Sequence, residues 1–198
     1  MKLLAIVGSP RLNGNTNYLV DVALAEAARL GAETEKVVLS QHRVDPCMGH
    51  ADCASVEFCR QLDDGEWILD RFCEADGVIL ATPVYYYNVS AWMKAFIDRN
   101  YFLYKRGRKS QARAVGIIIV AEVEGIEDTL HTLKQFVGES FRVGDGQVFL
   151  VCGYAGGPGD ARGDAALVES ARNLGRQMVE TLAGGASQRG QPPPKSQG

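Results

Sequence analysis

The sequence predicts an α/β protein built on a doubly wound parallel sheet of five strands. Short apolar runs recur along the chain, and each is too short for a helix but suits a strand buried on both faces. Longer segments with helical periodicity separate these runs, as crossover helices separate parallel strands. Glycine and proline punctuate the pattern, for example at Gly31 and Pro83.

The elements can be placed in order along the chain. The apolar run at residues 3–7 predicts the first strand, and a helix follows near residues 16–30 with Gly31 as its stop signal. The other strands are expected at residues 35–39, 77–82, 114–120 and 147–152. The other helices are expected near residues 66–73, from the N-cap Ser90 to residue 99, at 126–141 and at 164–182.

The pattern favours a single domain over residues 1–183. Residues 40–65 interrupt it with a polar, cysteine-containing insertion that has little periodicity. Residues 184–198 are rich in glycine, serine, glutamine and proline, and we expect them to form a disordered tail.

Composition narrows the class of protein. The 198 residues are 46% hydrophobic, which is enough for a sizeable core, and the net charge of −3 argues against a nucleic-acid partner. No apolar stretch reaches the roughly 20 residues that span a bilayer. The sequence Ser9-Pro10-Arg11 interrupts the first apolar run too early for a signal peptide, so we expect a cytoplasmic protein.

The turn after the first strand predicts an anion site. Small polar residues and a glycine precede the first helix, whose N-terminus carries partial positive charge: Ser9, Asn13, Gly14, Asn15 and Thr16. The spacing fits neither a nucleotide-triphosphate loop, which needs a lysine, nor a dinucleotide fingerprint. A terminal phosphate monoester, held by hydroxyls, amides and Arg11, is one interpretation. An ordinary, well-capped strand-to-helix turn is the other.

A second segment favours the ligand interpretation. The third predicted strand stops at Pro83 and continues into residues 84–89, which include three successive tyrosines. Three tyrosines at the end of a strand cannot all point into the core, and they suit a planar aromatic ligand. Alternatively, one or two of them pack under the next helix.

The two segments together resemble the NADPH-dependent FMN reductase family, and its iron–sulfur flavoprotein branch above all. The resemblance spans residues 1 to about 183 and implies a flavodoxin-like fold with strand order 2-1-3-4-5. It implies that the FMN phosphate is held by Ser9, Arg11, Asn15 and Thr16. It implies further that the flavin ring is lined by Pro83, Val84, Tyr85, Tyr86 and Asn88, and bordered by Gly153 and Tyr154.

The insertion carries an ambiguous cysteine motif. The iron–sulfur branch has four cysteines spaced Cys-x₂-Cys-x₂-Cys-x₅-Cys for a [4Fe–4S] cluster. This chain has Cys47, Cys53 and Cys59 at three of these positions and His50 at the second. Such ligands could hold a cluster or a zinc ion, but one thiolate is missing, so we expect the segment to be free of metal. The chain's other two cysteines, at positions 73 and 152, are expected in the core.

These features predict an FMN-dependent oxidoreductase that passes electrons from NAD(P)H to a small-molecule or protein acceptor. The cofactor supplies the chemistry, and no catalytic side chain is predicted. Alternatives are an electron-transfer flavoprotein without nicotinamide oxidase activity and a flavin-free interaction protein. We also expect a homodimer or homotetramer, with the aromatic run at residues 101–104 as a contact surface or, equally, as the helix's own core face.

Overall fold

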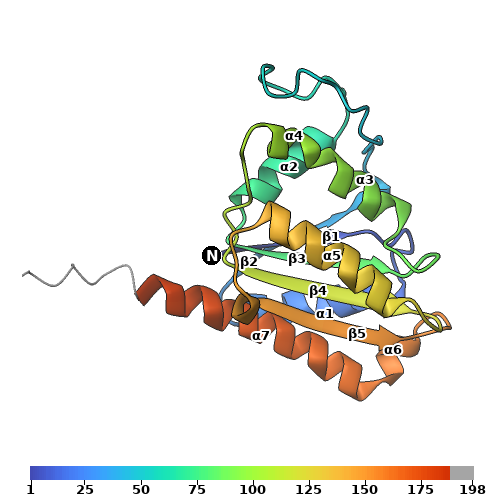
Figure 1. Cartoon of the computed structure of the whole chain (residues 1–198). Helices are drawn as coiled ribbons and strands as arrows, with labels where there is room; N and C mark the ends of the chain where they lie inside the picture. The colour runs from blue at the N-terminus through green and yellow to red at the C-terminus, as the bar shows by residue number, and fades with distance from the viewer. Residues whose placement is uncertain (188–198) are drawn as a thin grey trace, which may run out of the picture.

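The computed structural model, which describes residues 1–187, is a three-layer α/β/α structure around one five-stranded parallel sheet (Figure 1). The strand order β2-β1-β3-β4-β5 confirms the predicted fold. The strands are β1 (Lys2–Val7), β2 (Glu33–Val38), β3 (Gly77–Pro83), β4 (Ala114–Ala121) and β5 (Val148–Tyr154). The helices are α1 (Asn15–Arg29), α2 (Gly65–Glu74), α3 (Ala91–Arg99), α4 (Tyr101–Lys105), α5 (Ile126–Ser140), α6 (Asp160–Gly163) and α7 (Ala165–Ser187).

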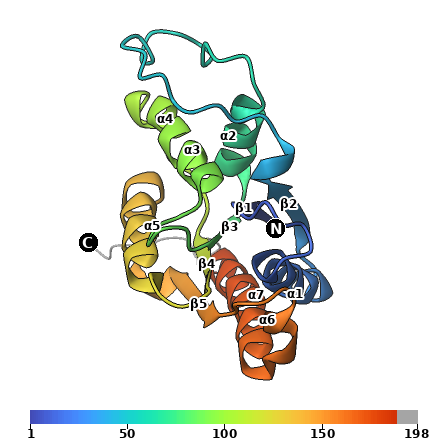
Figure 2. The same cartoon turned by 90° about the vertical axis from the view of Figure 1, so that its right-hand side faces the viewer.

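The helices cover the two faces of the sheet as separate groups (Figure 2). Helices α1, α6 and α7 cover one face, and helices α2 to α5 cover the other. Every residue of β4 is buried, because a central strand of a doubly wound sheet has helices on both sides. On the first face α1 and α7 cross closely at Gly175, where an added Cβ would lie 2.2 Å from the carbonyl oxygen of Ala23.

The structure corrects three sequence-based expectations. Helix α7 ends at Ser187, beyond the predicted boundary at residue 183; the rest of the expected tail, residues 188–198, lies outside the described residues. Cys152 is exposed instead of buried, because β5 is an edge strand and Cys152 lies on its exposed face together with Leu150 and Tyr154. Cys73 is only partly buried. Within the described residues, the structure has no helix long and apolar enough to cross a membrane.

Parallel pairing places several loops at the carboxyl edge of the sheet. Backbone hydrogen bonds continue beyond the strands: Gly8 N donates to the Ala81 carbonyl at 2.8 Å, and Ala155 N donates to the Ala121 carbonyl at 2.8 Å. The loops that follow β1, β3, β4 and β5 are therefore held side by side. Residues 42–64, which precede α2, form the irregular insertion. It stands out beyond α2 and α4 in Figure 1.

Candidate functional site

A cavity of about 320 Å³ lies at the carboxyl edge of the sheet. All four loops contribute to it, as expected for the crevice of an open α/β sheet. The β1–α1 loop and the start of α1 supply Ser9, Arg11, Asn13, Gly14, Asn15 and Thr16. The ends of β3 and β4 and the β5–α6 loop supply Pro83, Val84, Tyr85, Val120, Ala121, Glu122, Ala155, Gly156 and Pro158.

The β1–α1 loop presents free hydrogen-bond donors to the cavity. Within the described residues, the backbone N–H groups of Asn15, Thr16 and Asn17 have no acceptor, as is usual for the first turn of a helix. The Thr16 hydroxyl has no protein partner there either, and Arg11 forms no ion pair. Together with the partial positive charge of the helix end, these groups have the character that suits an anion.

The loop is rigidly built. Gly14 N donates to the Arg11 carbonyl at 2.9 Å, and the same carbonyl accepts from Asn17 Nδ2 at 3.0 Å. An added Cβ at Gly14 would lie 2.9 Å from the Arg11 carbonyl oxygen, so the turn requires a glycine. The Ser9 hydroxyl accepts a hydrogen bond from Arg11 N at 3.3 Å.

The Asn15 side chain has other partners than the predicted phosphate. Its Nδ2 donates to the carbonyls of Gly157 at 2.9 Å and Ala155 at 3.4 Å. Its Oδ1 accepts from the backbone N–H groups of Gly159 at 3.1 Å and Ala161 at 3.3 Å. The side chain therefore joins the first loop to the β5–α6 loop.

The tyrosine segment is a tight turn in which only the first tyrosine reaches the cavity. Tyr85 and Asn88 pair through two backbone hydrogen bonds, and the two residues between them have positive φ: Tyr86 at 48° and Tyr87 at 62°. This is the pattern of a type I′ turn, in which asparagine and glycine are preferred over bulky residues. Tyr86 is fully exposed, and neither it nor Asn88 lines the cavity.

Two contacts hold this turn in place. The Tyr87 hydroxyl donates to the Glu124 carboxylate, and this hydrogen bond raises the pKa of Tyr87. Ser90 caps α3 as predicted, because its Oγ accepts from Met93 N at 3.2 Å. The same hydroxyl donates to the Gly8 carbonyl at 2.6 Å, which fixes the tyrosine segment against the first loop.

The sequence did not indicate that the end of β4 contributes to the cavity. β4 ends at Ala121 and carries no recognisable motif, but the strand order implied by the resemblance places its end beside β3. The sequence placed the loop after β5 beside the crevice with Gly153 and Tyr154 as the candidates, and the residues of that loop that line the cavity are Ala155, Gly156 and Pro158. Gly153 does not line the cavity: an added Cβ there would lie 2.5 Å from Leu167 of α7, so its missing side chain serves helix packing. Tyr154 is 60% exposed and also lies outside the lining.

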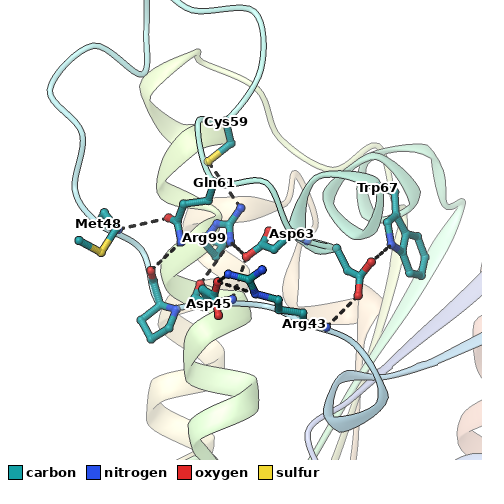
Figure 3. Close-up of polar contacts among 11 residues, drawn as sticks. Arg43, Asp45, Met48, Cys59, Gln61, Asp63, Trp67 and Arg99 are labelled. Carbon is teal, nitrogen blue, oxygen red and sulfur yellow. Dashed lines mark hydrogen bonds and ion pairs between the residues drawn. The ribbon is translucent and has the colours of Figure 1, made fainter.

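The insertion is anchored to the end of α3 by a buried ion pair (Figure 3). Arg99 Nη1 lies 2.5 Å from Asp63 Oδ2, and both side chains are almost completely buried. Burial opposes ionisation of Asp63, but hydrogen bonds from Arg99 and from two backbone N–H groups lower the pKa of this carboxyl. Arg99 also donates to the Asp45 carbonyl at 3.2 Å and to Cys59 Sγ at 3.5 Å. Gly65 packs directly on the guanidinium, where an added Cβ would lie 2.8 Å from Arg99 Cζ.

The three cysteines of the insertion are neighbours. Burial and then the nearby thiols of Cys59 and Cys47 raise the pKa of Cys53, and Cys53 Sγ donates to the His50 carbonyl at 3.1 Å. In the described part of the chain, no three His, Cys, Asp or Glu side chains converge in a way that could hold a metal ion. The donor set itself, three thiols and one imidazole, lacks the fourth thiolate of a cysteine-ligated [4Fe–4S] cluster.

The strand order and the helices on both faces define a flavodoxin-like α/β protein, with a crevice at the switch point of its sheet. Residues 1–155 match the sequence profile of the NADPH-dependent FMN reductase family. An iron–sulfur flavoprotein of Methanocaldococcus jannaschii is 36% identical over 189 residues, covering 92% of this chain and 97% of that protein. The chain belongs to the NADPH-dependent FMN reductase family, with iron–sulfur flavoproteins among its relatives.

Two further comparisons agree with this placement. An iron–sulfur flavoprotein of Archaeoglobus fulgidus is 46% identical over 99 residues, which cover 50% of this chain and 45% of that protein. Among solved structures, the NAD(P)H:quinone oxidoreductase from Methanothermobacter marburgensis superposes with a TM-score of 0.71 at 16% identity, over 90% of this chain and 96% of that one. At this identity the likeness concerns the fold.

Proposed function

We propose that this protein binds FMN in the cavity at the carboxyl edge of the sheet and uses it to oxidise NAD(P)H. The observation that carries the proposal is the set of free donors at the start of α1, next to an apolar wall. The backbone N–H groups of residues 15–17, the Thr16 hydroxyl and the Arg11 guanidinium suit a phosphate dianion. A cavity of about 320 Å³ lies within the usual range for small-molecule sites.

The roles of the residues follow from their positions. Residues of the β1–α1 loop would hold the phosphate, and Pro83, Val84 and Tyr85 would contact the ring. FMN supplies the hydride-accepting ring when it is bound, so no protein acid or nucleophile is required for the transfer. Val120, Ala121 and residues of the β5–α6 loop would complete the lining around the bound cofactor. Glu122 adds a carboxylate to the cavity lining, to which Arg11 also belongs.

One experiment tests both parts of the proposal. The visible spectrum of the purified protein should show bound flavin, and anaerobic addition of NADPH should bleach it. The flavin released by heat should be FMN, because the first loop lacks the glycine pattern of a dinucleotide site. Stoichiometric FAD would contradict the assignment of the cofactor. A flavin that dithionite bleaches and NADPH and NADH do not would identify an electron-transfer flavoprotein instead.

A further inference from the structure

We infer that Asn15 is a positioning residue that builds one wall of the flavin cavity, and that it is not a ligand of the phosphate. This inference rests on the proposed binding of FMN. It concerns a residue for which the sequence suggested direct contact with the phosphate.

The first step of the argument is the hydrogen-bonding capacity of the side chain. A carboxamide has two N–H donors and an oxygen with two lone pairs, so it makes four good hydrogen bonds. Asn15 makes all four within the protein, with Ala155, Gly157, Gly159 and Ala161. No side-chain donor is left for a phosphate oxygen. Only the backbone N–H of Asn15 remains free.

The second step is what these four bonds hold. Gly156 and Pro158 line the cavity, and they lie within the segment that Asn15 fixes from residue 155 to residue 161. The ends of this segment have anchors of their own: Ala155 N bonds to the Ala121 carbonyl, and Ala161 is completely buried. Between them, the Asn15 side chain is the tie to the β1–α1 loop, across about 140 residues of sequence.

The third step is that the contact is polar and specific. Nδ2 donates to two carbonyls and Oδ1 accepts from two N–H groups. The contact therefore requires both the donor and the acceptor of a carboxamide. Leucine has the same shape but makes none of these bonds. Removing the amide leaves backbone groups without partners, which frees residues 155–159 from the first loop.

The experiment compares two flavins that differ in the phosphate. Apo protein is titrated with FMN and with riboflavin, and the dissociation constants are measured by fluorescence quenching. For Asn15→Leu we expect both affinities to fall by the same factor, about tenfold or more, because each lost hydrogen bond contributes to the shape of the cavity. The ratio of the two affinities should stay that of the wild type.

Thr16→Val is the matched control, because Thr16 lines the cavity and its hydroxyl has no partner within the described residues. We expect it to lower FMN affinity about tenfold and to leave riboflavin affinity unchanged. A selective loss of FMN affinity in Asn15→Leu would overturn the inference, and so would unchanged affinity for both flavins. Failure of the wild-type protein to bind either flavin would refute the proposed function instead.

Hydrogen exchange provides a readout that needs no flavin. The amides of Gly159 and Ala161 donate to Asn15 Oδ1, so they should exchange faster in flavin-free Asn15→Leu and at the wild-type rate in Thr16→Val. Asn15→Ala serves as a gentler second variant if the leucine variant does not fold. Wild-type exchange at both amides in a folded Asn15 variant would show that the side chain does not hold the loop.

Discussion

At the scale of single residues, the strained tyrosine turn is the clearest departure from ordinary backbone preference. A left-handed conformation costs about 1–2 kcal/mol for a residue with a Cβ, and Tyr86 and Tyr87 both adopt it. Tyr87 has a hydrogen bond to Glu124, whereas the Tyr86 side chain is fully exposed. Strain of this kind concentrates at functional sites, and this turn directly follows the cavity residue Tyr85.

We predict that Tyr86→Asn raises the free energy of unfolding of the flavin-free protein by about 1 kcal/mol. Asparagine tolerates positive φ better than tyrosine does, and the exposed ring gives up no packing. Denaturant titration measures the change. Tyr104→Asn is the control, since Tyr104 is 65% exposed in a helix and its replacement should bring no gain. A Tyr86→Asn protein no more stable than the wild type would mean that the tyrosine turn is relaxed in solution.

At the scale of elements, the insertion determines whether the chain holds a metal. Cys59 is fixed by Arg99, and Cys53 and Cys47 lie nearby, but His50 occupies the position of the missing thiolate. We predict near-zero iron and zinc in the native protein. We also predict that His50→Cys increases cluster retention after anaerobic reconstitution, because it completes the four-cysteine spacing.

Metal analysis and visible absorbance check these predictions. The control is Cys53→Ala, in which flavin reduction by NADPH should survive. One tightly bound metal atom per chain in the native protein would contradict the metal-free expectation. Equal cluster content in His50→Cys and the wild type would show that ligand number does not limit binding.

The sequence predicted the elements well where one local signal was sufficient. The third strand was expected at residues 77–82 and spans Gly77–Pro83, and Ser90 caps α3 as its residue type indicates. Contacts between distant segments could not be predicted in this way. The hydrogen-bond partners of the Asn15 side chain lie about 140 residues away in the sequence. At Gly153, the Leu167 side chain of α7 leaves no room for a Cβ. An asparagine and a glycine at these two positions suit a ligand site and a structural role equally well.

At the scale of the whole molecule, helices α3, α4 and α5 leave an open groove of about 560 Å³ between them. Of the aromatic run at residues 101–104, Phe102 and Leu103 are buried, whereas the Tyr101 and Tyr104 rings are exposed, stacked and part of the groove wall. The run is thus core on one side and free surface on the other. We propose that a second copy of the chain covers this surface.

Light scattering at micromolar concentration should accordingly show a dimer or tetramer. Tyr104→Glu should shift the protein toward the monomer, because a charge placed on an apolar contact surface opposes the burial of that surface. Leu62→Glu is the matched control, since Leu62 is 92% exposed in the insertion and far in sequence from the groove. A monomeric wild-type protein with full flavin occupancy would contradict the proposal.

The ion pair between Arg99 and Asp63 has a consequence for the ancestry of the chain. A loss of Asp63 alone, with the rest of the insertion in place, would leave the guanidinium buried without its carboxylate, which costs about 3–5 kcal/mol. A larger residue at position 65 would displace the same guanidinium. Asp63, Gly65 and Arg99 should therefore be inherited or replaced together. A lineage that keeps the insertion but replaces Asp63 must first, or at the same time, exchange Arg99 in α3.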